Sequence, residues 1–236
     1  MSIAKVKKMD KREKAGAVIV AAGTSERMGS VDKLFAPIDG KPVLARVIDI
    51  FQQCKSVNQI VLVVSGGNLE LCQRLVAEQE WTKVTRICLG GKRRQDSVAA
   101  GLSQLNQCQW VIIHDGARPL VSVELIENGL DTARETGAAV AAVPVTDTIK
   151  ITDNDRVVQN TPSRQSLWAV QTPQIFRSDI ITKAYQQATV EVTDDATLVE
   201  RLSYKVKLYM GSYNNIKITT PDDLVLAEAL WQNYER

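Results

Sequence analysis

Short apolar runs recur along the chain, and each ends in a polar, glycine-containing segment. A parallel strand covered on both faces reads as an unbroken apolar run rather than as an alternation of apolar and polar positions. The pattern therefore predicts five such strands, at residues 17–22, 59–64, 84–89, 110–113 and 138–145.

Between these runs, apolar residues recur every three or four positions, which is the spacing of one helix face. The first such stretch opens at Lys41-Pro42 and places Val43, Val47 and Phe51 on one side. Strands that alternate with helices indicate an α/β fold, with a mostly parallel sheet and helices on both faces. Further helices are predicted at 69–76, at 98–105, from Ser122, from Ser178, at 194–202 and from Thr220.

The alternation stops at Asp147, where two short strands are predicted at 148–152 and 156–159 around a turn sequence. Alternating apolar residues such as Ile149 and Ile151 indicate a projecting arm that is buried against a second subunit. An arm folded back on its own domain is the alternative. Further on, strands are predicted at 205–210 and 215–219, whereas neither a helix nor a strand is predicted at residues 167–174.

The loop after the first strand carries Gly23, Arg27, Gly29 and Lys33 at the edge where open α/β sheets bind ligands. Glycines let the backbone approach a ligand, and Arg and Lys attract phosphate oxygens. The loop therefore favours a nucleotide-phosphate site over the alternative, a solvated loop with two basic residues. The two common phosphate-loop patterns do not fit. No Lys-Ser or Lys-Thr follows Gly29, and Ser25 stands where a dinucleotide site has its second glycine.

Two further loops at predicted strand ends carry charged residues. These are Lys92, Arg93 and Arg94 after the third strand, and Asp115 and Arg118 after the fourth. Cations around one strand-end carboxylate suit a polyphosphate with a divalent metal, because Mg²⁺ is usually held by one or two carboxylates together with substrate phosphates. A charged surface turn is the alternative for the basic residues.

The composition is that of an ordinary soluble globule, with 44% hydrophobic and 24% charged residues. The net charge of +2 is too small to indicate binding to nucleic acid or to a membrane. Lys and Arg crowd the start of the chain, which predicts a solvated basic tail over 1–15 and a single domain over 16–236. The tail contains no apolar stretch long enough for a signal peptide or an anchor.

The four cysteines, Cys54, Cys72, Cys88 and Cys108, lie 16 to 20 residues apart. They form no Cys-x-x-Cys pair, and the single histidine, His114, cannot complete a zinc site with them at a usual spacing. We therefore expect buried free thiols, a reducing compartment and a cytoplasmic protein.

Five motifs follow one another along the chain: AAGTSERMG with Asp32-Lys33, GGKRRQDSV, HDGARP, TPQ at 172–174 and NIKITTPDDL at 215–224. In this order they resemble the 2-C-methyl-D-erythritol 4-phosphate cytidylyltransferase family of the non-mevalonate isoprenoid pathway. The resemblance implies a Rossmann-like domain with a β-arm, at about 147–170, that forms a homodimer. It also implies CTP as a substrate, Mg²⁺ as a requirement and pyrophosphate as a product.

The resemblance assigns roles to individual residues on the nucleotide side. It implies Ala21, Ala22, Gly23, Arg27 and Lys33 at the triphosphate, Gly91 and Ser97 at the cytosine and ribose, and Arg94 in support of that loop.

Near the second substrate the resemblance implies Asp115 at the metal and the substrate, with Arg118, Thr193 and Lys217 nearby. It also implies that Thr148 and Arg164 contribute to the substrate pocket of the neighbouring subunit. Asn214 stands where some members of the family have an acid.

The implied reaction is an in-line attack of the 4-phosphate on the α-phosphorus of CTP, without a covalent enzyme intermediate. A phosphate monoester is already an anion, so the site needs positioning and neutralisation rather than a strong base. Arg27, Lys33 and Lys217 are the catalytic candidates. The alternatives are a sister enzyme, either a ribitol phosphate cytidylyltransferase or a molybdopterin guanylyltransferase, and a non-enzymatic nucleotide-binding regulator. HDGARP and Pro221-Asp222-Asp223 favour the isoprenoid family, and a regulator would not need both Arg27 and Lys217.

Overall fold

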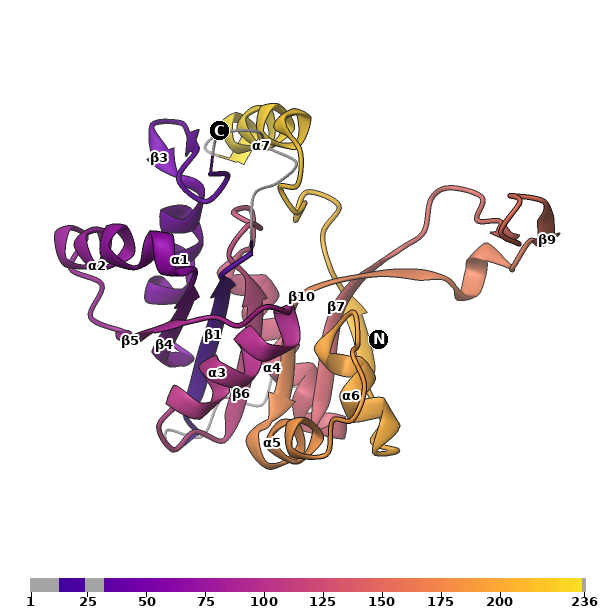
Figure 1. The fold of residues 1–236 in the computed structure, drawn as a ribbon, viewed down its shortest axis with the longest axis horizontal. Coiled ribbons are helices and arrows are strands. Elements are labelled where there is room, and N and C mark those ends of the chain that lie inside the picture. Colours follow the sequence, from indigo (N-terminus) through magenta and orange to yellow (C-terminus); the bar gives the residue numbers. More distant parts are fainter. Residues whose placement is uncertain (1–12, 24–31, 235–236) are drawn as a thin grey trace, which may run out of the picture.

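The computed structural model describes residues 13–23 and 32–234, and its centre is a seven-stranded sheet in the order β11-β7-β10-β6-β1-β4-β5 (Figure 1). Within the described residues the sheet is parallel except for β10, which runs antiparallel to its neighbours β6 and β7. This confirms the predicted mostly parallel α/β sheet. The seven strands are β1 (Ala15–Ala21), β4 (Val57–Val64), β5 (Val84–Leu89), β6 (Trp110–Asp115), β7 (Ala138–Pro144), β10 (Trp168–Arg177) and β11 (Lys207–Met210).

Helices cover both faces of the sheet, which explains why β1 has no polar side chain along its whole length. Along β1, Ile19 packs into the cluster with α1 and α4, whereas Val18 packs into the cluster on the α3 side. The helices are α1 (Val43–Gln53), α2 (Leu69–Glu78), α3 (Arg94–Gln104), α4 (Val123–Thr136), α5 (Ser178–Gln186), α6 (Asp195–Arg201) and α7 (Pro221–Tyr234).

The last helix, α7, lies apart from the two main layers, beside β2 (Pro37–Ile38) and β3 (Lys41–Pro42) (Figure 1). Its start is capped as predicted, because Asp223 N donates to Thr220 Oγ1 at 3.3 Å and Thr220 N donates to Asp223 Oδ2 at 2.9 Å. The Arg46 guanidinium lies 4.0 Å from the centre of the Trp231 ring and joins α7 to the body of the protein.

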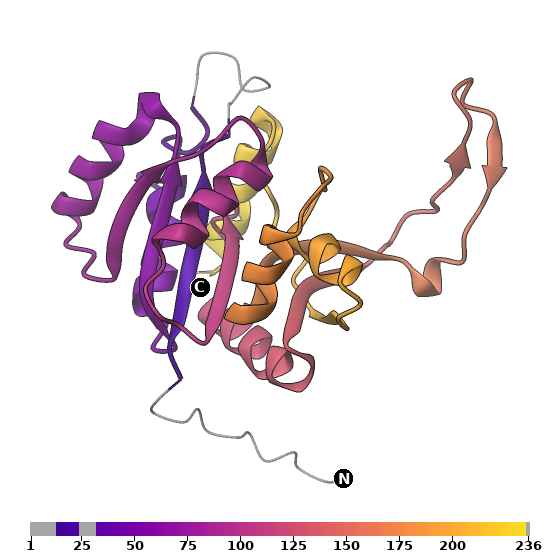
Figure 2. The same ribbon diagram turned by 60° about the horizontal axis from the view of Figure 1, so that its bottom comes forward.

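The predicted hairpin is present as β8 (Ile151–Thr152) and β9 (Val158–Asn160), which pair antiparallel. Figures 1 and 2 both show it standing away from the rest of the ribbon. We call residues 147–167 the arm. Its turn is built on Asp153, whose Oδ1 accepts from the backbone N–H of Asp155 and of Val157.

Two expectations about strands are wrong. The sequence pattern predicts neither a helix nor a strand at residues 167–174, yet β10 runs through them and lies between β6 and β7. Residues 215–219 were expected to form a strand and do not. That segment instead follows the loop after β6, where Ile218 N donates to Ala117 O at 2.9 Å.

All four cysteines are free thiols. Cys54 and Cys72 are buried as expected, but Cys88 and Cys108 are only partly buried, because both lie at the margin of the α3 layer. Across residues 13–23 and 32–234, none of the helices combines the length and apolar character that crossing a bilayer requires.

Candidate active site

A cavity of about 350 Å³ opens at the carboxyl ends of β1, β5 and β6. All three loops that the sequence places at strand ends contribute to its walls. Among the described residues that line it, five are basic and Asp115 is the single acid. The predicted site residues that line it are Ala21, Ala22, Gly23, Lys33, Gly91, Arg94, Ser97, Asp115 and Lys217, and Lys92 and Arg93 line it as well.

Asp115, the last residue of β6, is surrounded by cations. Lys217 Nζ lies 2.9 Å from Oδ2, and Arg94 Nε lies 3.3 Å from Oδ1. Arg118 Nε lies 3.5 Å from Oδ2, which is an ion pair without hydrogen-bond geometry. Burial raises the pKa of this carboxyl, but the charges of Arg94, Lys217 and Arg118 outweigh burial and hold the pKa well below its usual range. Asp115 is therefore an anion at any physiological pH.

The backbone of Asp115 is held by a buried polar chain that begins on β10. Asp115 N donates to Thr172 Oγ1 at 3.0 Å. His114 Nε2 lies 3.3 Å from Arg118 O, and because a carbonyl only accepts, Nε2 of the neutral ring carries the proton and donates. His114 Nδ1 is then the acceptor for the Thr172 hydroxyl, at 3.1 Å. Burial lowers the pKa of His114 to about 4, so the ring is neutral. His114 is thus a structural residue and not a base open to a substrate.

Lys217 reaches the cavity because the loop before α7 is fastened to the same polar chain. Asn215 is fully buried, and its Nδ2 donates to Thr172 O at 2.8 Å. Arg118 Nη1 donates in turn to Asn215 O at 2.8 Å. Lys217 follows two residues later, so its position relative to Asp115 depends on these two hydrogen bonds of Asn215.

The opposite wall is formed by the turn after β5. Gly91 N donates to Ser97 Oγ at 3.1 Å, and Ser97 stands in the first turn of α3. A side chain at Gly90 would place its Cβ 2.3 Å from Ala22 Cβ and 2.6 Å from Ser97 Oγ. Glycine is therefore needed here for close approach between the β1 and β5 loops.

Several predicted residues do not line this cavity. Arg27 lies outside the described residues. Thr193 is exposed in the loop before α6, and Arg118 lies behind Asp115 rather than in the wall. Thr148 and Arg164 are exposed on the arm, where Arg164 Nη1 donates to Thr146 O at 2.5 Å.

Three residues that support the site were missed by sequence reasoning: Thr172, Asn215 and Asp195. The first two stand inside motifs that carry the family resemblance, and this was a usable signal. Asp195 follows Asp194, and two adjacent acids at a helix start read as an N-cap and its neighbour. Asp194 is indeed the cap of α6, whereas Asp195 Oδ2 lies 2.9 Å from Arg94 Nη1.

The donor atoms suit a metal that arrives with a phosphate ligand. Within the described part of the chain, no cluster of three or more His, Cys, Asp or Glu residues could hold an ion by itself. Asp115 supplies one ionised carboxylate in a cavity with a large excess of cations, and Mg²⁺ commonly binds through one carboxylate together with substrate phosphates.

Comparison with known proteins decides the family. The sequence model of the 2-C-methyl-D-erythritol 4-phosphate cytidylyltransferase family matches residues 15–233. The chain belongs to this family. It is therefore an enzyme of the nucleotidyltransferase class, and the resemblance recognised in the five motifs is confirmed.

Named relatives of the same cytidylyltransferase family match over most of their length. The protein of that name from Dehalococcoides mccartyi (strain ATCC BAA-2266 / KCTC 15142 / 195) is 54% identical over 92% of this chain and 96% of its own. The one from Alkaliphilus oremlandii is 44% identical over 94% of this chain and 97% of its own. Among solved structures, the 4-diphosphocytidyl-2C-methyl-D-erythritol synthase from Anaerococcus prevotii has a TM-score of 0.84 at 32% identity, covering 93% of this chain and 99% of that one.

Proposed function

We propose that the protein joins CTP and 2-C-methyl-D-erythritol 4-phosphate to give the cytidine diphosphate sugar alcohol and pyrophosphate. The observation that carries the proposal is the cavity at the strand ends, whose described wall holds five basic side chains and one acid, the ionised Asp115. Such a wall suits a polyphosphate anion, and family membership supplies the cytidylyl group and the second substrate.

The reaction that this site supports is direct transfer. The 4-phosphate attacks the α-phosphorus of CTP in line, forming one P–O bond as the bond to pyrophosphate breaks. The attacking group is already an anion, so catalysis depends on positioning and charge neutralisation. We assign these tasks to Lys33 and Lys217 in the cavity wall and to Arg27. The single histidine, His114, is buried and hydrogen-bonded on both nitrogens, which supports transfer without a covalent enzyme intermediate.

We assign Mg²⁺ to Asp115 together with phosphate oxygens of CTP. The ion would neutralise charge on the triphosphate. Lys217, Arg94 and Arg118 already hold this carboxylate ionised and fixed in direction. For the cytosine and ribose we assign the turn at Gly91 and Ser97.

The test is a panel of the four nucleoside triphosphates, each with methylerythritol phosphate and Mg²⁺, in which pyrophosphate release is measured. We expect pyrophosphate release when CTP is supplied together with methylerythritol phosphate, and no release when CTP is supplied without it. Turnover with GTP in preference to CTP would instead support a guanylyltransferase, and turnover with ribitol phosphate in preference to methylerythritol phosphate would support the sister cytidylyltransferase. CTP binding without turnover of any acceptor would support a regulator.

We further propose a homodimer formed through the arm. The arm leaves large apolar side chains in solvent at Ile149, Ile151, Val157 and Val158. Four large apolar side chains exposed on one short segment exceed the scattered single residues of an ordinary monomer surface, which favours an interaction site. A second copy of the chain is the occupant that symmetry favours, because a two-fold axis buries the same arm on both subunits at once.

Two further exposed apolar side chains lie at the base of the arm. Val170 on β10 pairs with Ala142 on β7, and Ala142 pairs with Met210 on β11, so the two flank the buried Ala142 in one row across the sheet. Val170 is 44% exposed and Met210 is 55% exposed. Since β11 is an edge strand, a partner subunit could cover this row and the arm together.

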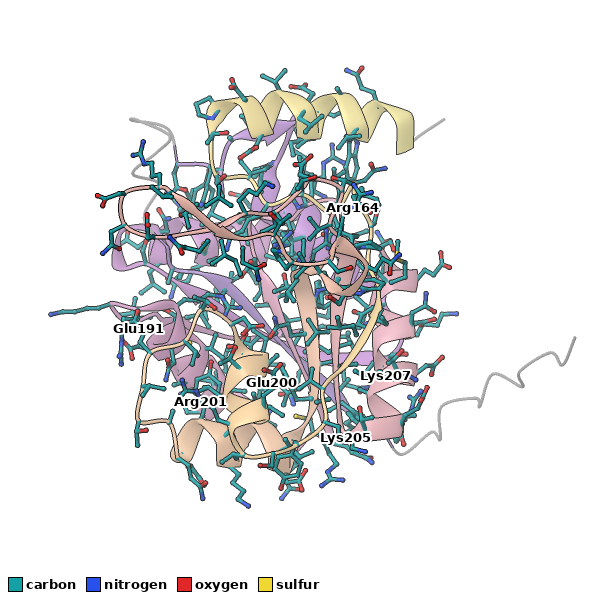
Figure 3. All side chains as sticks on the ribbon, turned by 90° about the vertical axis from the view of Figure 1, so that its right-hand side faces the viewer. Arg164, Glu191, Glu200, Arg201, Lys205 and Lys207 are labelled. Carbon is teal, nitrogen blue, oxygen red and sulfur yellow. The ribbon has the colours of Figure 1, made fainter. Side chains whose placement is uncertain are left out.

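Arg164 is the residue that such a dimer would bring to a cavity. Figure 3 looks at the molecule from the side of the arm and shows Arg164 in the upper part of the view, with Glu200, Arg201, Lys205 and Lys207 in the lower part. Arg164 is exposed and does not line its own subunit's cavity. We assign it, with Thr148, to the substrate pocket of the partner subunit. There its guanidinium would donate two parallel hydrogen bonds to the phosphate group of methylerythritol phosphate.

Light scattering coupled to size-exclusion chromatography tests the dimer, with an expected mass of twice 26.0 kDa. A monomer at micromolar concentration would remove the shared site and leave the nucleotide cavity untouched. Because all four thiols are free, we place the protein in a reducing compartment, the cytoplasm.

A further inference from the structure

A second carboxylate lies beneath the cavity and contacts the same guanidinium as Asp115. Asp195 begins α6 and is only 1% exposed. Its Oδ2 lies 2.9 Å from Arg94 Nη1, an ion pair without hydrogen-bond geometry, and its Oδ1 accepts a hydrogen bond from the Tyr185 hydroxyl at 2.5 Å. One oxygen of this buried carboxylate is thus held by a cation and the other by a neutral donor.

Arg94 therefore lies between two acids that belong to different layers. Its Nε faces Asp115 Oδ1 at 3.3 Å, while its Nη1 faces Asp195. A guanidinium is planar, so partners at two of its nitrogens fix both the direction and the plane of the group. Arg94 also lines the cavity, which makes it the link between the buried Asp195 and the ligand space.

The framework around Asp195 is tied to the strand that ends at Asp115. Gln174 on β10 is almost fully buried, and its Oε1 accepts from Ala196 N at 3.0 Å while its Nε2 donates to Asp194 Oδ2 at 3.0 Å. Gln174 pairs with Ile113 of β6, two residues before Asp115. The start of α6 is consequently set against the same strand end that presents Asp115.

We propose that Asp195, oriented by Tyr185, is a positioning residue for the transfer reaction, and that it acts by holding Arg94 in the plane in which Nε meets Asp115. Without the Asp195 carboxylate, Arg94 keeps Asp115 as its anionic partner and loses the second point that fixes its plane. The geometry around Asp115 then loosens at the atoms that meet the reacting phosphates. This inference rests on the proposed function, since it concerns turnover in that reaction.

The expected result for Asp195→Asn is a fall in kcat of about 10- to 100-fold, the usual cost of removing a partner that orients a site residue. The KM for CTP should change by less than about threefold, because the hydrogen bond that shapes the turn, from Gly91 N to Ser97 Oγ, involves neither Arg94 nor Asp195. Asn matches Asp in shape but not in charge, whereas Glu keeps the charge and adds a methylene. A positioning role through charge therefore predicts that Asp195→Glu retains more activity than Asp195→Asn, and a packing role predicts the reverse.

Tyr185→Phe keeps the ring and removes the hydroxyl that orients Asp195, so a smaller fall in kcat is expected. Tyr204→Phe is the matched control. Tyr204 packs partly buried in the same layer, with the Lys183 amine 5.9 Å from its ring centre, and should lose no turnover when its hydroxyl is removed. This pair keeps the proposal testable even if Asp195→Asn does not fold.

The experiment measures kcat and KM for each variant, with kcat expressed per site that binds CTP by calorimetry, so that loss of folded protein does not count as loss of catalysis. Asp195→Asn is also combined with Arg94→Lys. If Asp195 acts through Arg94, the double variant should lose much less than the product of the two single losses. Normal kcat per binding site in Asp195→Asn, better retention by Asn than by Glu, or independent losses in the double variant would each overturn the proposal. Failure of the wild-type protein to release pyrophosphate from CTP would overturn the proposed function itself.

Discussion

Complementation between two inactive variants tests whether active sites are shared across a dimer. In the proposed dimer, each site combines Lys217 of one subunit with Arg164 of the other. Arg164→Ala and Lys217→Ala each alter both sites of their own homodimer. A heterodimer of the two variants has one site with both native residues and one site that lacks both.

The magnitude follows from the contacts. Lys217 Nζ lies 2.9 Å from Asp115 Oδ2 in the cavity, and removal of one preorganised donor from such a site lowers kcat on the order of 10²-fold. Each homodimeric variant should therefore keep about 1% of wild-type turnover. The heterodimer should recover about half of wild-type turnover, because one of its two sites is intact; this is about a 50-fold gain over either parent.

The two variants are co-expressed with different affinity tags, and the heterodimer is isolated by two successive affinity steps. Pyrophosphate release is then followed with CTP, methylerythritol phosphate and Mg²⁺. Lys150→Ala serves as a control on the arm, since Lys150 is exposed there and its Nζ donates to Thr161 Oγ1 within the same arm. A confirmed heterodimer with no more activity than its parents would place Arg164 in its own subunit's site and refute the shared arrangement.

Three further predictions concern single positions. Lys33→Ala should lower kcat on the order of 10²-fold while weakening CTP binding much less, because a cation at the phosphates stabilises developing charge. Calorimetry measures the binding and steady-state kinetics the turnover, and near-normal turnover would remove Lys33 from the mechanism. Gly90→Ala should destabilise the fold by about 1–3 kcal/mol, because its Cβ would lie 2.3 Å from Ala22 Cβ, whereas Gly67→Ala, with open space at its Cβ, should be far milder in thermal melts. Burial raises the pKa of the Cys72 thiol from 9.0 to about 11. Its contribution to the free energy of unfolding is then complete below pH about 9 and lost as the pH rises through about 11, so the alkaline decline measured by urea titration should be shallower in Cys72→Ala.

The parts of the fold that could be predicted were those in which one rule dominates. β1 and the last five residues of β4 are covered on both faces, so both read as unbroken apolar runs. α4 begins at a Ser122 cap, whose Oγ accepts from Leu125 N at 3.1 Å, and ends at Gly137 in the left-handed region. In each case the local pattern and the tertiary environment agree.

β10 could not be predicted because its centre violates the rule for a central strand. Gln171, Thr172, Pro173 and Gln174 are polar or lack an N–H, and such a run argues against a strand inside a sheet. Here the pairing with β7 shifts register between Val170 and Gln174, and the three polar side chains are buried because each finds partners from distant segments. Those partners are 20 to 57 residues away, so no local window contains the information.

The same reason separates the predictable from the unpredictable parts of the site. The strand-end loops with Gly91 and Asp115 could be read locally, because glycines and charges stand next to apolar runs. Asn215 stands in a motif of the family resemblance, but local physical rules do not reveal its role, because that role consists of contacts with Thr172 O and, through its own carbonyl, with Arg118. The segment around it looked like a strand because Ile216 and Ile218 alternate with polar residues, yet it is bound to a loop rather than to a sheet.

The position of the arm in the topology has a consequence for how the protein can vary. β7 and β10 are antiparallel neighbours, and Val145 N donates to Leu167 O at 3.1 Å where the arm departs. The arm is therefore an enlarged hairpin loop whose two ends already lie side by side. Its length can change without shifting the register of either strand, and each doubling of a flexible loop costs only about 0.6 kcal/mol. The arm can therefore be lengthened, shortened or exchanged by evolution or by engineering, which would change the surfaces that meet in the proposed dimer, while the scaffold beneath Asp115 stays in register.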